Sequence, residues 1–145
     1  MSYRITGTGS CIPDIAKKNS DFLKNKFLDT NGGKFQSSNS EIIDKFNSIT
    51  GICERRYAPD EINCSDLAAV AAGLAINDSK LDQETLDYII VAHNTGDISC
   101  SSGQVDTLPS VASKVKAKLK IKNPNCVAYD IICGCPGWVE GIIQA

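Results

Sequence analysis

Apolar residues recur along the chain with the periods that distinguish strands from helices. Tyr3 to Thr8 alternates polar and apolar side chains and runs into glycines, which predicts a strand that ends in a turn. Leu86 to Ala92 and Cys126 to Ile132 are continuous apolar runs of the kind that buried parallel strands show. These three segments are the strands we expect in one sheet.

Helical periodicity separates the predicted strands. The strongest pattern follows Ser65, which can cap a helix whose apolar residues return every three or four positions. Four further helices are expected, capped at Asn19 or Ser20, spanning Glu41 to Ser48, beginning at Pro109, and beginning near Pro136. The alternation of strands and helices predicts an α/β class, with a mostly parallel sheet and flanking helices.

Two polar stretches without periodicity, Asn31 to Ser40 and Asn94 to Thr107, are expected to be surface loops. Neither has the character of a domain linker, so residues 1–145 are predicted to form one half-domain. The apolar segment from Pro136 to Ala145 has no capping glycine and no strand after it. We therefore expect the fold to be incomplete at its carboxyl end.

Charge and composition exclude several classes of partner. Lys and Arg total 15 against 17 Asp and Glu, so no positive field favours nucleic acid or an anionic membrane. No segment approaches the roughly 20 apolar residues that span a bilayer, and the first ten residues lack the regions of a signal peptide. A cytoplasmic location is the expectation.

Seven cysteines, an odd number with no export signal, are interpreted as reduced thiols, most of them small and buried. Cys133 and Cys135 lie two apart, which keeps a redox or metal module among the hypotheses. Because His93 is the only histidine and no paired C-x-x-C occurs, no metal is expected. His93 follows a strand and is interpreted as a histidine with satisfied hydrogen bonds, not as a general base.

The turn after the last predicted strand carries the candidate chemistry. The strand delivers Cys135 into a tight turn, and Pro136 suits the first helical position, which places Cys135 at the helix cap. The positive end of the helix favours the thiolate, which is the form that attacks a thioester carbonyl. The free backbone N–H of Cys135 could hold the developing oxyanion. A buried structural cysteine is the alternative, and Trp138 is expected in the core.

Two motifs carry a family resemblance. The segment Asp130 to Trp138 is similar to the D-x-x-x-x-C-x-G-F/W region of the beta-ketoacyl-acyl-carrier-protein synthases III, with Cys135, and not Cys133, at the nucleophile position. Thr50-Gly-Ile-Cys-Glu-Arg-Arg56-Tyr-Ala58 resembles the T-G-I-x-x-R-R-x-A stretch of the same family. With the order of the predicted elements, the chain resembles the amino-terminal half of these thiolase-superfamily condensing enzymes.

The resemblance implies an acyltransferase of fatty acid biosynthesis. A starter acyl group would pass to Cys135, and malonyl on acyl carrier protein would be decarboxylated and condensed with it to give a 3-oxoacyl thioester. The family uses a His and an Asn of its second half for the later step, so this chain by itself is expected to give no turnover. A non-catalytic half-domain that assembles with a partner is the alternative function.

The resemblance also implies substrate-binding and dimer residues. Thr50, Arg55 and Arg56 correspond to the entrance for a phosphopantetheine-bearing substrate, although both arginines could equally be surface charges. Leu108 falls where the family sends an apolar side chain across a homodimer interface, the alternative being packing at a helix start.

The carrier of the starter group stays open at this stage. Lys45 and Ile49 stand where family members that load from coenzyme A have a Trp and an Arg around the adenine. Acyl carrier protein is the expected partner, and the starter arrives either on it or as acyl-CoA. No cofactor is expected beyond these thioester substrates.

Overall fold

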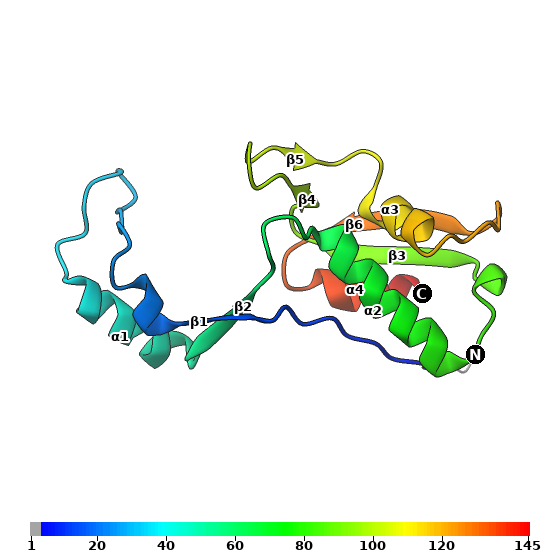
Figure 1. Ribbon diagram of the computed structural model, residues 1–145, viewed down its shortest axis with the longest axis horizontal. Helices are drawn as coiled ribbons and strands as arrows, with labels where there is room; N and C mark the ends of the chain where they lie inside the picture. The colour runs from blue at the N-terminus through cyan, green and yellow to red at the C-terminus, as the bar shows by residue number, and fades with distance from the viewer. Residues whose placement is uncertain (1–3) are drawn as a thin grey trace. The chain divides into compact units, whose positions relative to one another are not determined.

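The chain folds into two compact units in the structure, a computed structural model that describes residues 4–145 (Figure 1). Unit 1 consists of the described residues up to Ile12 together with Asp60–Ala145, and unit 2 of Pro13–Pro59. Unit 2 therefore interrupts unit 1 in the sequence. A single half-domain over residues 1–145 stays a prediction.

A pair of parallel strands forms the middle layer of unit 1. Strand β3 (Tyr88–His93) pairs with β6 (Val127–Ile132) in a register that runs from Tyr88 opposite Val127 to His93 opposite Ile132. This pairing confirms two of the three strands that the apolar runs predict. Because the strands are parallel, their carboxyl ends lie at the same edge, where Cys133 follows β6.

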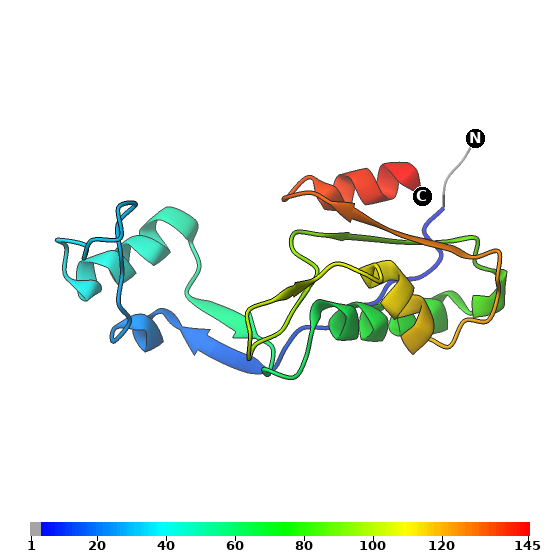
Figure 2. The same ribbon diagram turned by 90° about the horizontal axis from the view of Figure 1, so that it is seen from above.

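Helices cover both faces of this strand pair, as Figure 2 shows. Helix α4 (Gly137–Gln144) packs on one face and α3 (Val111–Lys118) on the other, while α2 (Cys64–Ser79) packs against α3. The arrangement confirms the expected α/β class with flanking helices.

The core of unit 1 is concentrated around α3. Val111, Ala112 and Val115 are at most 1% exposed, and Cys126 is the buried residue just before β6. The helix begins after Ser110, whose hydroxyl accepts the Ser113 N–H, and not at Pro109 as predicted. Serine takes the cap because its side chain can accept that hydrogen bond, which a proline side chain cannot.

The cap of α2 lies two residues before Ser65, the residue predicted to cap it. Asn63 is the N-cap, and the Asp66 carboxylate accepts the Asn63 N–H at 2.9 Å. The Ser65 N–H donates instead to the Asp97 carboxylate at 2.8 Å, so this serine lies buried within the first turn.

The amino-terminal segment packs along α2 and forms no strand over Arg4 to Thr8. Tyr3, the first residue of the predicted strand, lies outside the described residues. A Cβ on Gly7 would lie 2.3 Å from the Ala75 carbonyl oxygen, and one on Gly9 would lie 2.2 Å from that of Ala71. The prediction of a strand over Arg4 to Thr8 is therefore wrong. This segment packs against helix α2 and pairs with no strand in residues 4–145.

Unit 2 is built on an antiparallel strand pair and one helix. Strand β1 (Ile15–Lys18) pairs with β2 (Glu54–Tyr57), and α1 (Asn39–Thr50) contains the predicted helix Glu41 to Ser48. Ser38 and Glu41 form a capping box at its start. The helix predicted after Asn19 is only the 3-10 turn η1 (Asn19–Phe22).

Smaller elements complete the fold. The predicted loop from Asn94 to Thr107 contains the antiparallel pair β4 (Asp97–Ile98) and β5 (Val105–Asp106), and η2 (Gln83–Thr85) precedes β3. Over residues 4–145, none of the helices is both long enough and apolar enough to cross a membrane.

Candidate active site

Cys135 lies in the turn that joins β6 to α4, and its side chain is exposed. The Gly137 N–H donates to the Gly134 carbonyl at 2.9 Å, which closes the turn. The cap of α4 is Pro136, and the first helical hydrogen bond runs from the Glu140 N–H to its carbonyl at 3.0 Å. Cys135 therefore precedes the cap by one residue and does not occupy it as predicted.

The start of α4 offers hydrogen-bond donors that the protein leaves unused. Pro136 provides no side-chain cap. The backbone N–H of Cys135 donates no hydrogen bond to any acceptor among residues 4–145. A donor beside an exposed thiol is suited to a carbonyl oxygen that gains negative charge as the sulfur attacks. The interpretation of Cys135 as a buried structural cysteine is wrong.

His93 has both ring nitrogens engaged. Its Nδ1 accepts the Gly96 N–H at 2.8 Å, which assigns the proton to Nε2, and Nε2 donates to the Asp130 carboxylate at 3.0 Å. Its side chain is only 6% exposed. These contacts confirm a satisfied histidine at the strand end and leave no free nitrogen that could take a proton from Cys135.

Asp130 joins this histidine to the start of α3. Its carboxylate also accepts the Val111 N–H at 2.7 Å and the Ala112 N–H at 2.8 Å. Burial by itself would raise the pKa of Asp130, but the hydrogen bonds from His93, Ala112 and Val111 together lower it below its ordinary value. Asp130 is thus ionised and positions the end of β6, five residues before Cys135.

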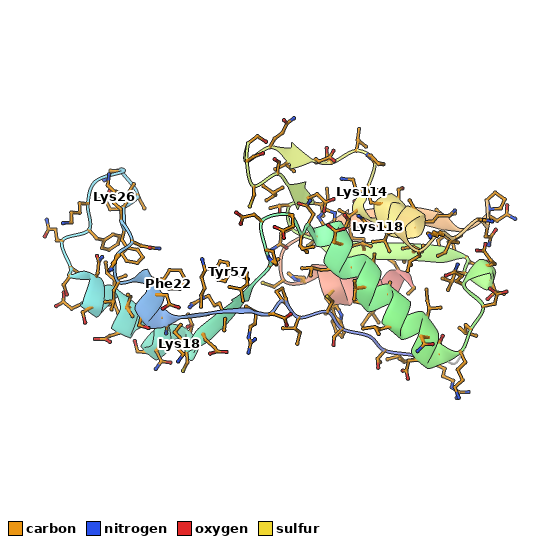
Figure 3. All side chains as sticks on the ribbon, viewed as in Figure 1. Lys18, Phe22, Lys26, Tyr57, Lys114 and Lys118 are labelled. Carbon is orange, nitrogen blue, oxygen red and sulfur yellow. The ribbon has the colours of Figure 1, made fainter. Side chains whose placement is uncertain are left out.

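A second carboxylate, that of Asp97, accepts a backbone N–H from the first turn of α2, as Asp130 does for α3. Asp97 accepts the Ser65 N–H and receives the Lys114 ammonium at 3.1 Å, and Lys114 also contacts Asp106 at 2.7 Å (Figure 3). Burial opposes ionisation of Asp97, yet the bonds from Ser65 and Lys114 lower its pKa. The sequence reasoning missed this group, because Asp97 stands in a polar stretch with no signal that distinguishes it.

The cysteines differ from one another in exposure. Only Cys126 is buried, so the prediction that most of them are buried is wrong, and all seven are free thiols. Among residues 4–145, no three His, Cys, Asp or Glu side chains are grouped as a metal ion would require.

Two apolar residues near the site are exposed. Leu108 is 82% exposed, which argues against packing at the start of α3, and its dimer role stays a prediction. Trp138 is 71% exposed, so its placement in the core is wrong. It lines a groove of about 560 Å³ between β3 and α4, to which β3 contributes Tyr88 and α4 contributes Ile142.

Thr50, Arg55 and Arg56 belong to unit 2, whereas Cys135 and Leu108 belong to unit 1. The Thr50 hydroxyl donates to the Phe46 carbonyl and accepts the Ile52 N–H at 3.1 Å, which closes the end of α1. This threonine is therefore committed to local structure.

The two arginines have different surroundings. Arg55 donates to the Asn19 side chain at 2.8 Å and lies over the rings of Phe22 and Phe46. Arg56 is more open, and its exposed guanidinium donates to Glu54 at 3.3 Å and to the Asp14 carbonyl at 3.4 Å. Arg55 is thus fixed in place, while Arg56 retains donors that face solvent.

Sequence comparison finds relatives that match the chain from end to end. It is 35% identical over 145 residues to beta-ketoacyl-acyl-carrier-protein synthase III 1 of Vibrio parahaemolyticus. It is 36% identical over 144 residues to the synthase III of Clostridium acetobutylicum. The chain spans 39% and 37% of these relatives' lengths. No family model matches the chain.

Solved structures give the same assignment. The 3-oxoacyl-acyl-carrier-protein synthase III of Aquifex aeolicus superposes with a TM-score of 0.71 at 28% identity, over 99% of this chain and 39% of that one. The priming beta-ketosynthase of the R1128 polyketide pathway, at 18% identity and a TM-score of 0.74, shares the fold. The chain is therefore a member of the beta-ketoacyl-acyl-carrier-protein synthase III group of thiolase-like proteins and corresponds to their amino-terminal part.

Proposed function

We propose that this chain supplies the acyl-accepting cysteine of a condensing enzyme. The Cys135 thiolate attacks the carbonyl carbon of an acyl thioester, the carrier thiol leaves, and the acyl group remains on Cys135. In the second stage, malonyl-acyl-carrier-protein loses carbon dioxide, and its carbanion takes the acyl group from Cys135. The product is a 3-oxoacyl thioester, and the Cys135 thiolate is regenerated.

The exposed thiol in the turn before α4 carries this proposal. Cys135 is reachable by a thioester, and its own N–H has no acceptor among residues 4–145. The end-to-end match to synthases III supports the same reading, because those relatives are named for this condensation. Acyl carrier protein is accordingly the proposed partner, in a cytoplasmic homodimer with Leu108 at its interface.

Arg56 is the proposed contact for the phosphopantetheine phosphate. It has an exposed guanidinium, whereas Asn19 and two aromatic rings hold Arg55 in place. Arg55 and Thr50 would then support the binding surface through their own local hydrogen bonds and would not contact the phosphate. Either acyl-CoA or acyl carrier protein can present such a phosphate.

Acyl transfer to Cys135 is testable by intact-protein mass spectrometry. The protein is exposed briefly to acetyl-CoA and to short and medium acyl thioesters, on coenzyme A and on carrier protein. One acyl group should be added and should map to Cys135. Cys135→Ser should abolish the adduct, and the matched variant Cys133→Ser should retain it. An adduct that survives the loss of Cys135 would contradict the proposal.

A non-catalytic half-domain is the second candidate. The exposed apolar side chains of α4, among them Trp138, Val139 and Ile143, favour it, because a covering partner would bury them. This candidate predicts no acyl adduct on Cys135 with any thioester, so the same labelling experiment separates the two functions.

A further inference from the structure

A second thiol stands two residues before the proposed nucleophile. The chain bends at Gly134, between Cys133 and Cys135, and a hydrogen bond of 2.9 Å from the Gly137 N–H to the Gly134 carbonyl closes the following turn, which contains Cys135. Consecutive Cα atoms are about 3.8 Å apart, so residues on either side of a bend lie roughly 5 to 6 Å apart. A disulfide needs Cα atoms about 4.4 to 6.8 Å apart. The bend therefore satisfies the first requirement for a bond between these sulfurs.

The two thiols differ in exposure and in how firmly the backbone holds them. Cys133 is half-buried and anchored, because its N–H donates to the His93 carbonyl at 3.2 Å. Cys135 is exposed and is the thiol that an oxidant meets first. Gly134 has no other atom within 4 Å of the place where a Cβ would stand, so the link between them has room to adjust. Rotation of the exposed Cys135 side chain can thus bring its sulfur toward that of the anchored Cys133.

We infer that Cys133 is a resolving thiol that forms a reversible disulfide with Cys135 when the protein meets a peroxide. The Cys135 thiolate attacks one peroxide oxygen, the O–O bond breaks, and a sulfenic acid forms with release of hydroxide. The Cys133 sulfur then attacks the sulfenic sulfur, the S–O bond breaks, and water leaves with the Cys133 proton. In total two thiols lose two hydrogen atoms, and one hydrogen peroxide becomes two waters.

The disulfide would mask the acyl-accepting thiol and protect it. A sulfenic acid without a nearby thiol is oxidised further to sulfinic acid, which is irreversible in most proteins. A disulfide closed over a single intervening residue is strained, and strained disulfides are reduced readily by cellular thiols. Only this consequence for catalysis rests on the proposed function, because the disulfide itself requires nothing more than the two thiols.

The pair can be detected by peptide mass after mild oxidation. The protein is treated with one equivalent of hydrogen peroxide, remaining thiols are alkylated, and a protease that cleaves before aspartate releases residues 130–145. This peptide contains Cys133 and Cys135 but not Cys126. It should lack both alkyl groups, weigh two hydrogen atoms less than the reduced peptide, and regain both thiols with glutathione.

Substitutions separate a resolving thiol from a bystander. With excess hydrogen peroxide, because a second peroxide is needed to oxidise the sulfenic acid further, Cys135 in Cys133→Ser and in Cys133→Ala should proceed to the sulfinic acid, and acylation by thioesters should not recover with glutathione. Cys100→Ser, which removes another exposed thiol, should behave like the unaltered protein. Equal over-oxidation of Cys135 with and without Cys133, or a disulfide from Cys135 to any other cysteine, would overturn the inference.

The two proposals fail separately. If the disulfide forms but no thioester acylates Cys135, the redox pair stands and the proposed function falls. If Cys135 is acylated but peroxide never links it to Cys133, the proposed function stands and the inference is wrong.

Discussion

The two helices next to β6 begin in opposite ways. The first turn of α3 is fully served, because Asp130 accepts the N–H groups of Val111 and Ala112 and Ser110 accepts that of Ser113. The start of α4 has no side-chain cap, and the exposed Cys135 stands beside it. The donors at the start of α3 hold the fold, whereas under the proposed function the Cys135 N–H before α4 is available to a reacting carbonyl. Strand β6 contacts the start of α3 through Asp130 and leads into α4 through the turn that contains Cys135.

Removal of the Asp130 carboxylate is the strongest test of this division. Asp130→Ala removes three hydrogen bonds to a buried charge, so the free energy of unfolding should fall by about 3 to 4 kcal/mol. Urea unfolding measures the loss. Glu140→Ala, in the exposed first turn of α4, is the matched control and should change it by less than about 0.5 kcal/mol. Equal losses at the two helices would remove the distinction between them.

Acid should destabilise the protein through the same carboxylates. The pKa values of Asp130 and Asp97 are lowered in the folded state, so below the ordinary value of 3.8 the unfolded chain binds protons that the folded chain does not. Their stabilisation is complete above that pH and is lost as the pH falls through the lowered values. Urea midpoints measured from pH 5 downward should decline, and more shallowly in Asp130→Asn. An identical decline in that variant would show that other groups are responsible.

The smallest effect should come from the cap of α3. Ser110→Ala removes the acceptor for the Ser113 N–H and should cost about 1 kcal/mol in thermal or urea unfolding. Ser110→Thr retains a hydroxyl at the same position and should recover most of the loss. If alanine and threonine are equally tolerated, the hydroxyl is not the cap that the geometry indicates.

The local pattern predicted the parallel strands because their continuous apolar runs are covered on both faces, and most helices because their apolar residues gather on one face. It failed for Arg4 to Thr8, where an extended segment meets α2 and not another strand. It also failed for Trp138, since periodicity shows that α4 has an apolar face but not what covers it. Element type is encoded locally, whereas the identity of the neighbour is not.

The candidate site shows the same limit. The strand, turn and helix around Cys135 follow from a few adjacent residues, and their order was predictable. The Asp97 and Lys114 contact joins residues from β4 and α3, with no spacing rule to indicate it. The cap of α4 was misplaced by one residue, because a turn between Gly134 and Gly137 precedes the helix.

The division of unit 1 by unit 2 sets an order of events during synthesis. Residues 4–12 leave the ribosome early, yet their partners on α2 come much later, as the bond from the Thr8 N–H to the Asp78 carboxylate spans 70 positions. Unit 2 has its strand pair and helix within residues 13–59 and can complete its contacts in the meantime. Residues 4–12 therefore have no α2 to pack against until residues 13–79 have all been made, and they stay accessible to chaperones and proteases for that whole interval.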